Sequence, residues 1–286
     1  MSIQINHLTH IYNEGTPFEK KALDDVNISI ENGEFIGLIG HTGSGKSTLI
    51  QHLNALLKPT HGEILLDGKN ILAEKEKLKD IRREIGLVFQ YPEYQLFETT
   101  IFKDVCFGPS NMGLSLDDVK KRAEDALETV GITKEFYEKS PFELSGGQKR
   151  RVAIAGVLAM LPKVLILDEP TAGLDPKGRD EILDAIKQMH DKLKITVILV
   201  SHSMEDVARL VSRIIVMYQG KMVMTGTPSE IFSKTEALEQ IGLAAPQISY
   251  VFAELKRKGY DVPTNIYTTA DAVEILYQMM KQVKSC

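Results

Sequence analysis

The stretch from Phe35 to Ile50 reads FIGLIGHTGSGKSTLI and decides the fold. Its first half is a short apolar run that ends in glycine, which predicts a buried strand. From Lys46 onward the composition is that of a helix start. Between the two halves, Gly40 to Ser47 matches the pattern G-x-x-x-x-G-K-[ST]. The sequence therefore predicts a phosphate-binding loop between a strand and a helix.

The spacing of this loop suits a nucleoside triphosphate for a physical reason. Glycines let the backbone curl so that successive N–H groups converge on an anion, and the following helix adds the positive end of its dipole. Lys46 can reach the terminal phosphates, and the Ser47 hydroxyl can ligate Mg²⁺. A glycine-rich turn with a solvated lysine is the plain alternative, which the flanking strand and helix disfavour. The predicted nucleotide-binding residues here are Gly40, His41, Thr42, Gly43, Ser44, Gly45, Lys46, Ser47 and Thr48.

Length and composition indicate a globular protein with room for about two domains. The chain has 286 residues, of which 43% are hydrophobic and 26% charged. Its longest apolar run, Val152 to Leu161, is shorter than the ~18 residues needed to span a bilayer. Cys106 and Cys286 lack metal-ligand spacing, which favours reduced thiols in a cytosol. A net charge of −5 gives no basic surface for nucleic acid, so no nucleic-acid partner is expected.

Two further strands are predicted to end in residues suited to phosphate chemistry. The apolar run Val164–Leu167 is followed by Asp168 and Glu169. Paired carboxylates at a strand end are costly unless they are used. Asp168 suits a magnesium ligand acting through water, and Glu169 suits a general base for the attacking water. His202 follows the strand Ile195–Val200; a lone histidine is more often structural, yet this position would face the phosphates.

A second helix start with anion-binding character lies near Ser145. Serine before two glycines is an ordinary helix cap, but it also makes a second N-terminus that can bind an anion. The helix is predicted to run to Leu161. Two anion sites in one chain favour a nucleotide shared between two chains. The residues assigned to this second site are Leu144, Ser145, Gly146, Gly147 and Gln148.

Strand-like and helix-like segments divide the rest of the chain. Tyr12 ends the first strand, where its ring can stack on a nucleobase or simply lie half-buried. Helical segments dominate from about residue 91 to about 160 and predict an inserted subdomain, and a mainly helical tail begins at Glu230. Strands are expected at Ile3–Tyr12, Asp25–Ile30, Gly62–Gly68, Ile85–Gln90, Arg213–Tyr218 and Met222–Met224, and helices at Lys46–Leu57, Ala73–Glu84, Leu116–Val130, Lys134–Lys139 and Lys177–Lys192.

The segment Tyr91–Phe97 has neither a helical nor a strand period. It gathers four large apolar or aromatic side chains around Pro92. These side chains either pack into the core or form an exposed docking surface, and the two interpretations carry similar weight.

Taken together, the motifs resemble those of ATP-binding-cassette (ABC) ATPases over about residues 2–242. Tyr12 looks like the family's A-loop, Gly40 to Ser47 like Walker A, and Gln90 like the Q-loop. Leu144 to Gln148 look like the signature, Val164 to Glu169 like Walker B, Asp175 like the D-loop and His202 like the H-loop. Residues 89–97 are similar to the Q-loop region of energy-coupling factor (ECF) vitamin and metal importers. Residues 16–23 and 171–179 look more like the second of that family's two ATPase paralogues.

This resemblance implies a fold and an assembly. The implied fold is α/β: a P-loop NTPase (RecA-like) core with an antiparallel β-subdomain, an inserted helical subdomain at about 91–160, and a helical C-terminal extension at 243–286. The family's ATPases work in pairs, and a heterodimer with a paralogue is favoured over a homodimer. The pair binds a transmembrane coupling protein and a substrate-binding membrane subunit, which places the chain peripherally on the cytoplasmic face of the cell membrane.

The resemblance also assigns roles within the site. ATP sits on the phosphate loop with Lys46, and Mg²⁺ is held by Ser47, Gln90 and Asp168. Glu169 is the base, His202 contacts the γ-phosphate, and Asp175 lies near the nucleotide in the D-loop. The coupling protein is expected to dock near Tyr91, Pro92, Glu93, Gln95, Leu96 and Phe97, with Leu96 and Phe97 as apolar anchors and with Glu93 and Gln95 fixing the register of a partner helix by hydrogen bonds.

Three alternatives remain open at this stage. One is the ATPase of a cobalt or nickel importer, or of another ABC transporter. A non-transport ABC ATPase of DNA repair or translation would be expected to carry long heptads or a basic surface, and neither is present in the sequence. A cassette that binds ATP without turnover is disfavoured by Glu169.

Overall fold

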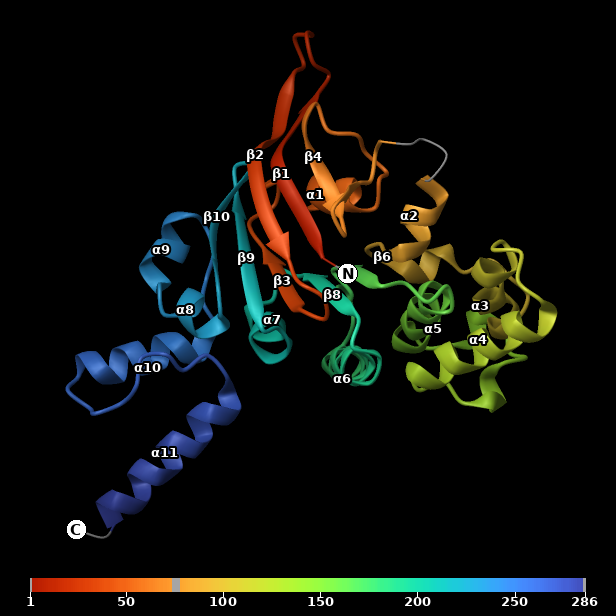
Figure 1. Cartoon of the computed structure of the whole chain (residues 1–286). Coiled ribbons are helices and arrows are strands. Elements are labelled where there is room, and N and C mark those ends of the chain that lie inside the picture. The colour runs from red at the N-terminus through yellow and green to blue at the C-terminus, as the bar shows by residue number, and fades with distance from the viewer. Residues whose placement is uncertain (1, 74–77, 285–286) are drawn as a thin grey trace.

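The computed structural model describes residues 2–73 and 78–284. Among these residues the strands form two sheets, and the helices gather around and beyond them (Figure 1). The predicted α/β fold class is confirmed. Two expectations lie partly or wholly outside the described residues: positions 74–77 of the predicted helix Ala73–Glu84, and the thiol of Cys286.

The first sheet is antiparallel, with described strands in the order β2-β1-β4-β5. Its strands are β1 (Ile3–Tyr12), β2 (Lys20–Ile30), β4 (His61–Leu66) and β5 (Lys69–Asn70). β2 begins at Lys20 and not at Asp25, the start predicted from the sequence, because its first residues pair with the end of β1: Tyr12 lies opposite Lys20, and His10 lies opposite Leu23. This pairing holds Tyr12 beside the start of β2.

The second sheet has its described strands in the order β10-β9-β3-β8-β7-β6. Its strands are β3 (Phe35–Ile39), β6 (Ile85–Val88), β7 (Val164–Asp168), β8 (Thr196–Val200), β9 (Arg213–Tyr218) and β10 (Lys221–Gly226). All neighbours pair in parallel except β9 and β10. Because β3, β6, β7 and β8 run in parallel, their carboxyl ends meet at one edge, which is where ligands bind in such sheets.

Side chains of this sheet alternate between two cores. On one face, Ile36, Ile166 and Ile198 pack with the antiparallel sheet and with α1 (Lys46–Leu53). On the other face, Leu165 and Leu199 pack with α6 (Pro176–Leu193) and α7 (Met204–Leu210). α1 ends at Leu53, four residues before the predicted end, because Ala55 is left-handed and the Asn54 amide hydrogen-bonds to the carbonyl of Ile85.

The predicted helical insertion lies to one side of the sheets (Figure 1). Its helices α3, α4 and α5 pack on one another and bury Val105, Leu127 and Val152 in the larger core. The bounds are α2 (Leu78–Glu84), α3 (Ile101–Ser110), α4 (Leu116–Thr129) and α5 (Gly146–Leu158), with short 3₁₀ helices at Pro92–Gln95, Lys134–Phe136 and Pro141–Glu143. The predicted helix Lys134–Lys139 is therefore a single 3₁₀ turn, and α5 stops short of Leu161.

The C-terminal part is helical and has a small core of its own. It comprises α8 (Pro228–Phe232), α9 (Thr235–Gln240), α10 (Gln247–Arg257) and α11 (Thr269–Lys284). Phe252, Val262, Ile266 and Ala272 form this core, while α11 extends away from the sheets (Figure 1). This separate cluster supports the division at residue 243, which stays a prediction. Within the described ranges, none of the helices combines the length and hydropathy needed to cross a membrane.

Candidate nucleotide-binding and catalytic site

A cavity of about 440 Å³ opens where the phosphate loop meets the carboxyl ends of the parallel strands. Residues from both sheets line it, since Tyr12 comes from β1 and its hydroxyl lies 3.3 Å from the Thr48 hydroxyl at the start of α1. The fold thus brings together most of the residues predicted for one site. Those lining the cavity are Tyr12, Thr42, Gly43, Gly45, Lys46, Ser47, Thr48, Gln90, Asp168, Glu169 and His202.

The phosphate loop is held by its own lysine. Lys46 is buried, and its Nζ donates to the carbonyl oxygens of Gly40, at 2.7 Å, and His41, at 3.1 Å. Burial lowers the pKa of Lys46, while the charges of Glu169 and Asp168 raise it. Gly45 caps α1 with φ 105°, and a Cβ there would lie 2.7 Å from the carbonyl of Ala22, so only glycine fits.

Asp168 is the last residue of β7, Glu169 follows it, and both line the cavity beside the loop. Burial raises the pKa of Asp168, and the Lys46 charge opposes that rise. Burial also raises the pKa of Glu169 to about 7, against a hydrogen bond from the His202 backbone that lowers it. Glu169 Oε1 lies 3.4 Å from His202 Nε2. Glu169 is left-handed, with φ 51°, a strained conformation for a side chain of its size, and such strain clusters at functional sites.

Three predicted loop residues do not line the cavity. Gly40 lies behind the loop, His41 packs edge-on against the ring of Tyr218, and Ser44 is fully buried. Two cavity residues from β2, Lys20 and Ala22, were not predicted, because a polar strand start carries no motif.

The second predicted anion site lies elsewhere in the chain. Ser145 caps α5 in a capping box with Gln148. With Gly146, Gly147 and Asp175 it lines a different cavity of about 410 Å³, so this chain does not bring it to its own phosphate loop. Leu144 is buried in the core, so its side chain supports the turn and does not face that cavity.

Comparison with known proteins assigns this geometry to a family. Residues 23–172 match the family model described as "ABC transporter". A protein of Caldanaerobacter subterraneus, named energy-coupling factor transporter ATP-binding protein EcfA2, is 58% identical over 285 residues, the full length of both chains. The protein of that name from Clostridium tetani is 60% identical over 98% of this chain and 97% of its own length. The chain belongs to the energy-coupling factor ATP-binding proteins of the ABC transporter family.

Solved structures agree with this assignment. CbiO1 of Clostridium perfringens, part of an ABC transporter complex called cbiONQ, is 41% identical, with a TM-score of 0.76 over 88% of this chain and 98% of its own. The ATP-binding cassette MJ0796, solved as a dimer in a post-hydrolysis state with ADP and Pi, is 32% identical, with a TM-score of 0.69 over 79% of this chain and 98% of its own. Like other ABC ATPases, the chain binds and hydrolyses ATP.

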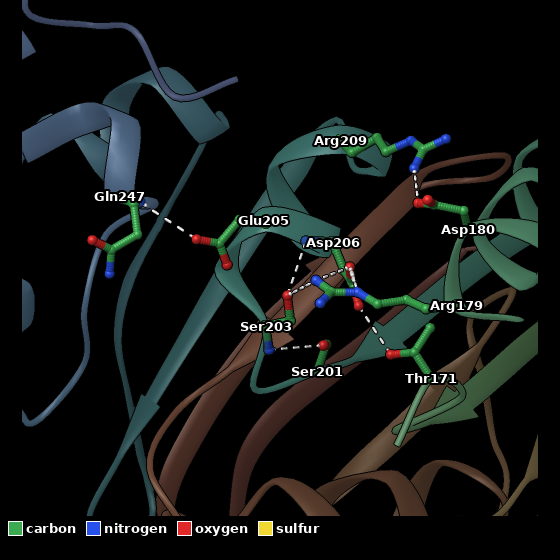
Figure 2. A network of polar contacts seen from close by, with 9 residues as sticks. All are labelled: Thr171, Arg179, Asp180, Ser201, Ser203, Glu205, Asp206, Arg209 and Gln247. Atoms are coloured by element: carbon green, nitrogen blue, oxygen red, sulfur yellow. Dashed lines mark hydrogen bonds and ion pairs between the residues drawn. The ribbon is translucent and has the colours of Figure 1, made fainter. Parts of the chain in front are cut away.

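In this ECF ATPase a polar network centred on the buried Asp206 contacts the turn that follows Glu169, called here the catalytic turn (Figure 2). The Asp206 carboxylate of α7 accepts from the Thr171 hydroxyl at 2.9 Å and from Arg179 Nε at 2.7 Å. The same residue's N–H donates to Ser203, next to His202. The network thus joins the turn after Glu169, the start of α6 and the His202 loop. The sequence did not reveal Asp206, because a charged residue in a helix start usually lies on the surface.

The segment Tyr91–Phe97, called here the docking segment, is partly exposed in this ECF ATPase. Tyr94 is 85% and Phe97 62% exposed, while Leu96 packs against the larger core. Pro92 is buried, and both carboxylate oxygens of Glu93 accept from Arg150. Glu93 is therefore held within this chain by Arg150, and its predicted role in fixing a partner's register stays a prediction.

Proposed function

We propose that this chain is the ATP-binding subunit of an ECF importer, which drives uptake of a vitamin or other micronutrient. The observation that carries the proposal is the separation of two anion-binding helix starts into two cavities, with the rest of the catalytic set around the first. A nucleotide on one chain's phosphate loop would need the Ser145–Gln148 turn of another. Relatives named as ECF transporter ATP-binding proteins match the full length of the chain.

The residues at the cavity fit ATP with Mg²⁺. Magnesium prefers hard oxygen ligands, and Ser47, Gln90 and Asp168 present a hydroxyl, an amide and a carboxylate to one cavity. One buried oxygen of the cavity lining, Glu169 Oε1, has no hydrogen-bond partner among the described residues. Buried polar atoms are normally satisfied, so this oxygen supports a polar ligand in the cavity. Bound Mg²⁺ would neutralise charge on the phosphates.

The catalytic work of the protein is positioning and proton transfer. Lys46 turns from the loop carbonyls to the terminal phosphates, and the ring of Tyr12 stacks on the base. Glu169 orients the attacking water and takes its proton. Burial lowers the pKa of His202, which favours the uncharged imidazole in the free chain, and a ring N–H of His202 donates to the γ-phosphate.

The raised pKa of Glu169 predicts a pH dependence of hydrolysis. A general base works only when deprotonated, and the Glu169 pKa lies at about 7. We therefore expect kcat/KM, which reports on the free enzyme, to rise with pH through about 7 and to fall roughly tenfold per pH unit below it. Steady-state hydrolysis over about two pH units on either side checks this. A flat profile in the wild type, or the same slope in Glu169→Gln, would contradict it.

The proposed function implies a partner ATPase and membrane subunits. We favour a heterodimer with a paralogue, with the pair bound peripherally on the cytoplasmic face of the cell membrane. A groove of about 600 Å³ runs from the docking segment between α3 and α5, and Phe97, Phe107 and Met160 line it. Such a groove suits an apolar helix of a transmembrane coupling protein, which carries a separate substrate-binding subunit.

The groove provides the test of the proposed function. We expect the tagged chain to recover a transmembrane coupling protein from detergent-solubilised membranes. Phe97→Ala with Phe107→Ala should reduce that recovery by about tenfold or more, because two apolar anchors of the interface are lost. Their rings meet edge to face at 4.9 Å, and the side chains are 62% and 48% exposed, so melting temperature and ATP binding should hold.

Leu116→Ala is the matched control, since Leu116 is 77% exposed at the start of α4 and lies outside the groove. It should leave recovery unchanged. If the wild type recovers no membrane protein, the importer function is wrong. If the wild type and the double variant both recover the coupling protein fully, the docking groove is wrong and the function stands. A cobalt or nickel importer, the alternative that the sequence leaves open, would be recognised by its substrate-binding subunit in the same experiment.

A further inference from the structure

A buried arginine lies between the docking segment and the catalytic turn. Arg150 belongs to α5 and its side chain is 1% exposed. Its Nε and Nη2 donate to the two carboxylate oxygens of Glu93, at 3.1 and 2.8 Å. Its Nη1 donates to the carbonyl oxygens of Pro170 and Ala172, both at 2.8 Å. One guanidinium group therefore makes four hydrogen bonds to two segments that are distant in sequence.

The chemistry of this contact makes it rigid. A buried charge is tolerated only when it is paired and hydrogen-bonded, and the planar fork of arginine matches a carboxylate in one geometry. The guanidinium cannot follow Glu93 without also pulling on the two carbonyls. A displacement at either end is therefore transmitted to the other.

Both ends of the contact adjoin strained backbone. Pro170 directly follows Glu169, whose φ is 51°, and the turn is closed by the Ala172 N–H donating to the Glu169 carbonyl. Glu93 lies two residues after Tyr91, whose φ is 56°. Left-handed conformations of large side chains persist only where the surroundings impose them, and Arg150 holds the residues beside both.

We propose that Arg150 is a positioning residue that couples the docking segment to the turn carrying Glu169. Movement of the docking segment shifts the Pro170 and Ala172 carbonyls and so changes where Glu169 points. Nucleotide binding at the catalytic turn changes the docking segment by the same route, since coupling between sites is reciprocal. The proposal rests on the proposed function only for the identity of what docks.

The test measures amide hydrogen exchange of residues 91–98 in the full chain, with and without a non-hydrolysable ATP analogue and Mg²⁺. In the wild type the analogue should change exchange of these amides by about fivefold or more, the lower range of coupling between sites. Arg150→Lys keeps the charge but loses the fork. It should reduce the change to less than about twofold while analogue affinity stays within about twofold.

Two further variants keep the test decisive. Glu93→Gln breaks the contact from the other end and should give the same loss, which covers the case in which Arg150→Lys fails to fold. Arg151→Lys is the matched control, because Arg151 is the next residue of α5 and pairs with Glu181 of α6. It should behave as the wild type. The proposal is overturned if Glu93→Gln keeps the full change, if Arg151→Lys loses it too, or if the wild type shows none.

This test separates the coupling from the importer function. Exchange is measured without any membrane protein. Failure to recover a coupling protein would therefore contradict the importer function and leave the proposed role of Arg150 untouched. In a reconstituted importer, Arg150→Lys should hydrolyse ATP with less dependence on the coupling protein. Hydrolysis that still responds fully to that protein would count against Arg150.

Discussion

Replacing Glu169 with Gln is expected to lower ATP hydrolysis by about 10²- to 10⁴-fold, the contribution of a positioned general base. Glutamine has the shape of the protonated acid and cannot take a proton from water. ATP should still bind normally and hold the pair closed, because Lys46 and the loop are intact. Single-turnover hydrolysis, nucleotide binding and size-exclusion chromatography with ATP measure the three effects.

Two control variants accompany Glu169→Gln. Lys46→Ala should weaken ATP binding itself, since we expect Lys46 to contact the phosphates in the ground state. Glu128→Gln changes an exposed carboxylate of α4 that does not line the cavity, and it should have no effect. Normal turnover by Glu169→Gln would remove Glu169 from the mechanism.

Mixing two inactive variants is expected to restore activity if the chain pairs with itself. Lys46→Ala destroys the phosphate loop, and Ser145→Arg blocks the turn that lines the second cavity. In a mixed pair, one site joins an intact phosphate loop to an intact Ser145 turn. Random pairing gives about half mixed pairs with one good site each, so about a quarter of wild-type hydrolysis should return.

Each variant alone should be nearly inactive, and the wild-type rate per chain should rise with protein concentration. Ser145→Ala serves as the control for loss of the helix cap, which costs about 1 kcal/mol, without blocking the site. If mixing the two variants restores nothing, the chain is next mixed with a paralogue. Hydrolysis by that second mixture would indicate a heterodimer. A rate independent of concentration from a verified monomer would refute the shared site.

The sequence predicted the parts of the site that depend on local pattern. The phosphate loop needs glycines at fixed spacing, which the sequence shows directly. Asp168, Glu169 and His202 come at the ends of apolar runs, so the sequence also predicted that they lie at strand ends. Parallel pairing then gathers strand ends at one edge, which is why residues from four strands meet around Lys46.

The contacts that brace the site could not be predicted, because they join residues with no shared period. Arg150 meets Glu93 across 57 positions and Pro170 across 20. Asp206 meets Thr171 across 35. A charged residue inside a helical pattern looks solvated until its partner is known, and this is why nothing in the sequence indicated that Arg150 holds Glu93.

The left-handed backbone of Glu169 has an evolutionary consequence. Glycine adopts φ near 51° without the roughly 1 kcal/mol that a larger residue loses there. Selection for thermal stability and selection for turnover therefore favour different residues at this one position. A lineage that no longer needed hydrolysis would gain stability by replacing this glutamate with glycine, so selection for stability would then favour that substitution at position 169.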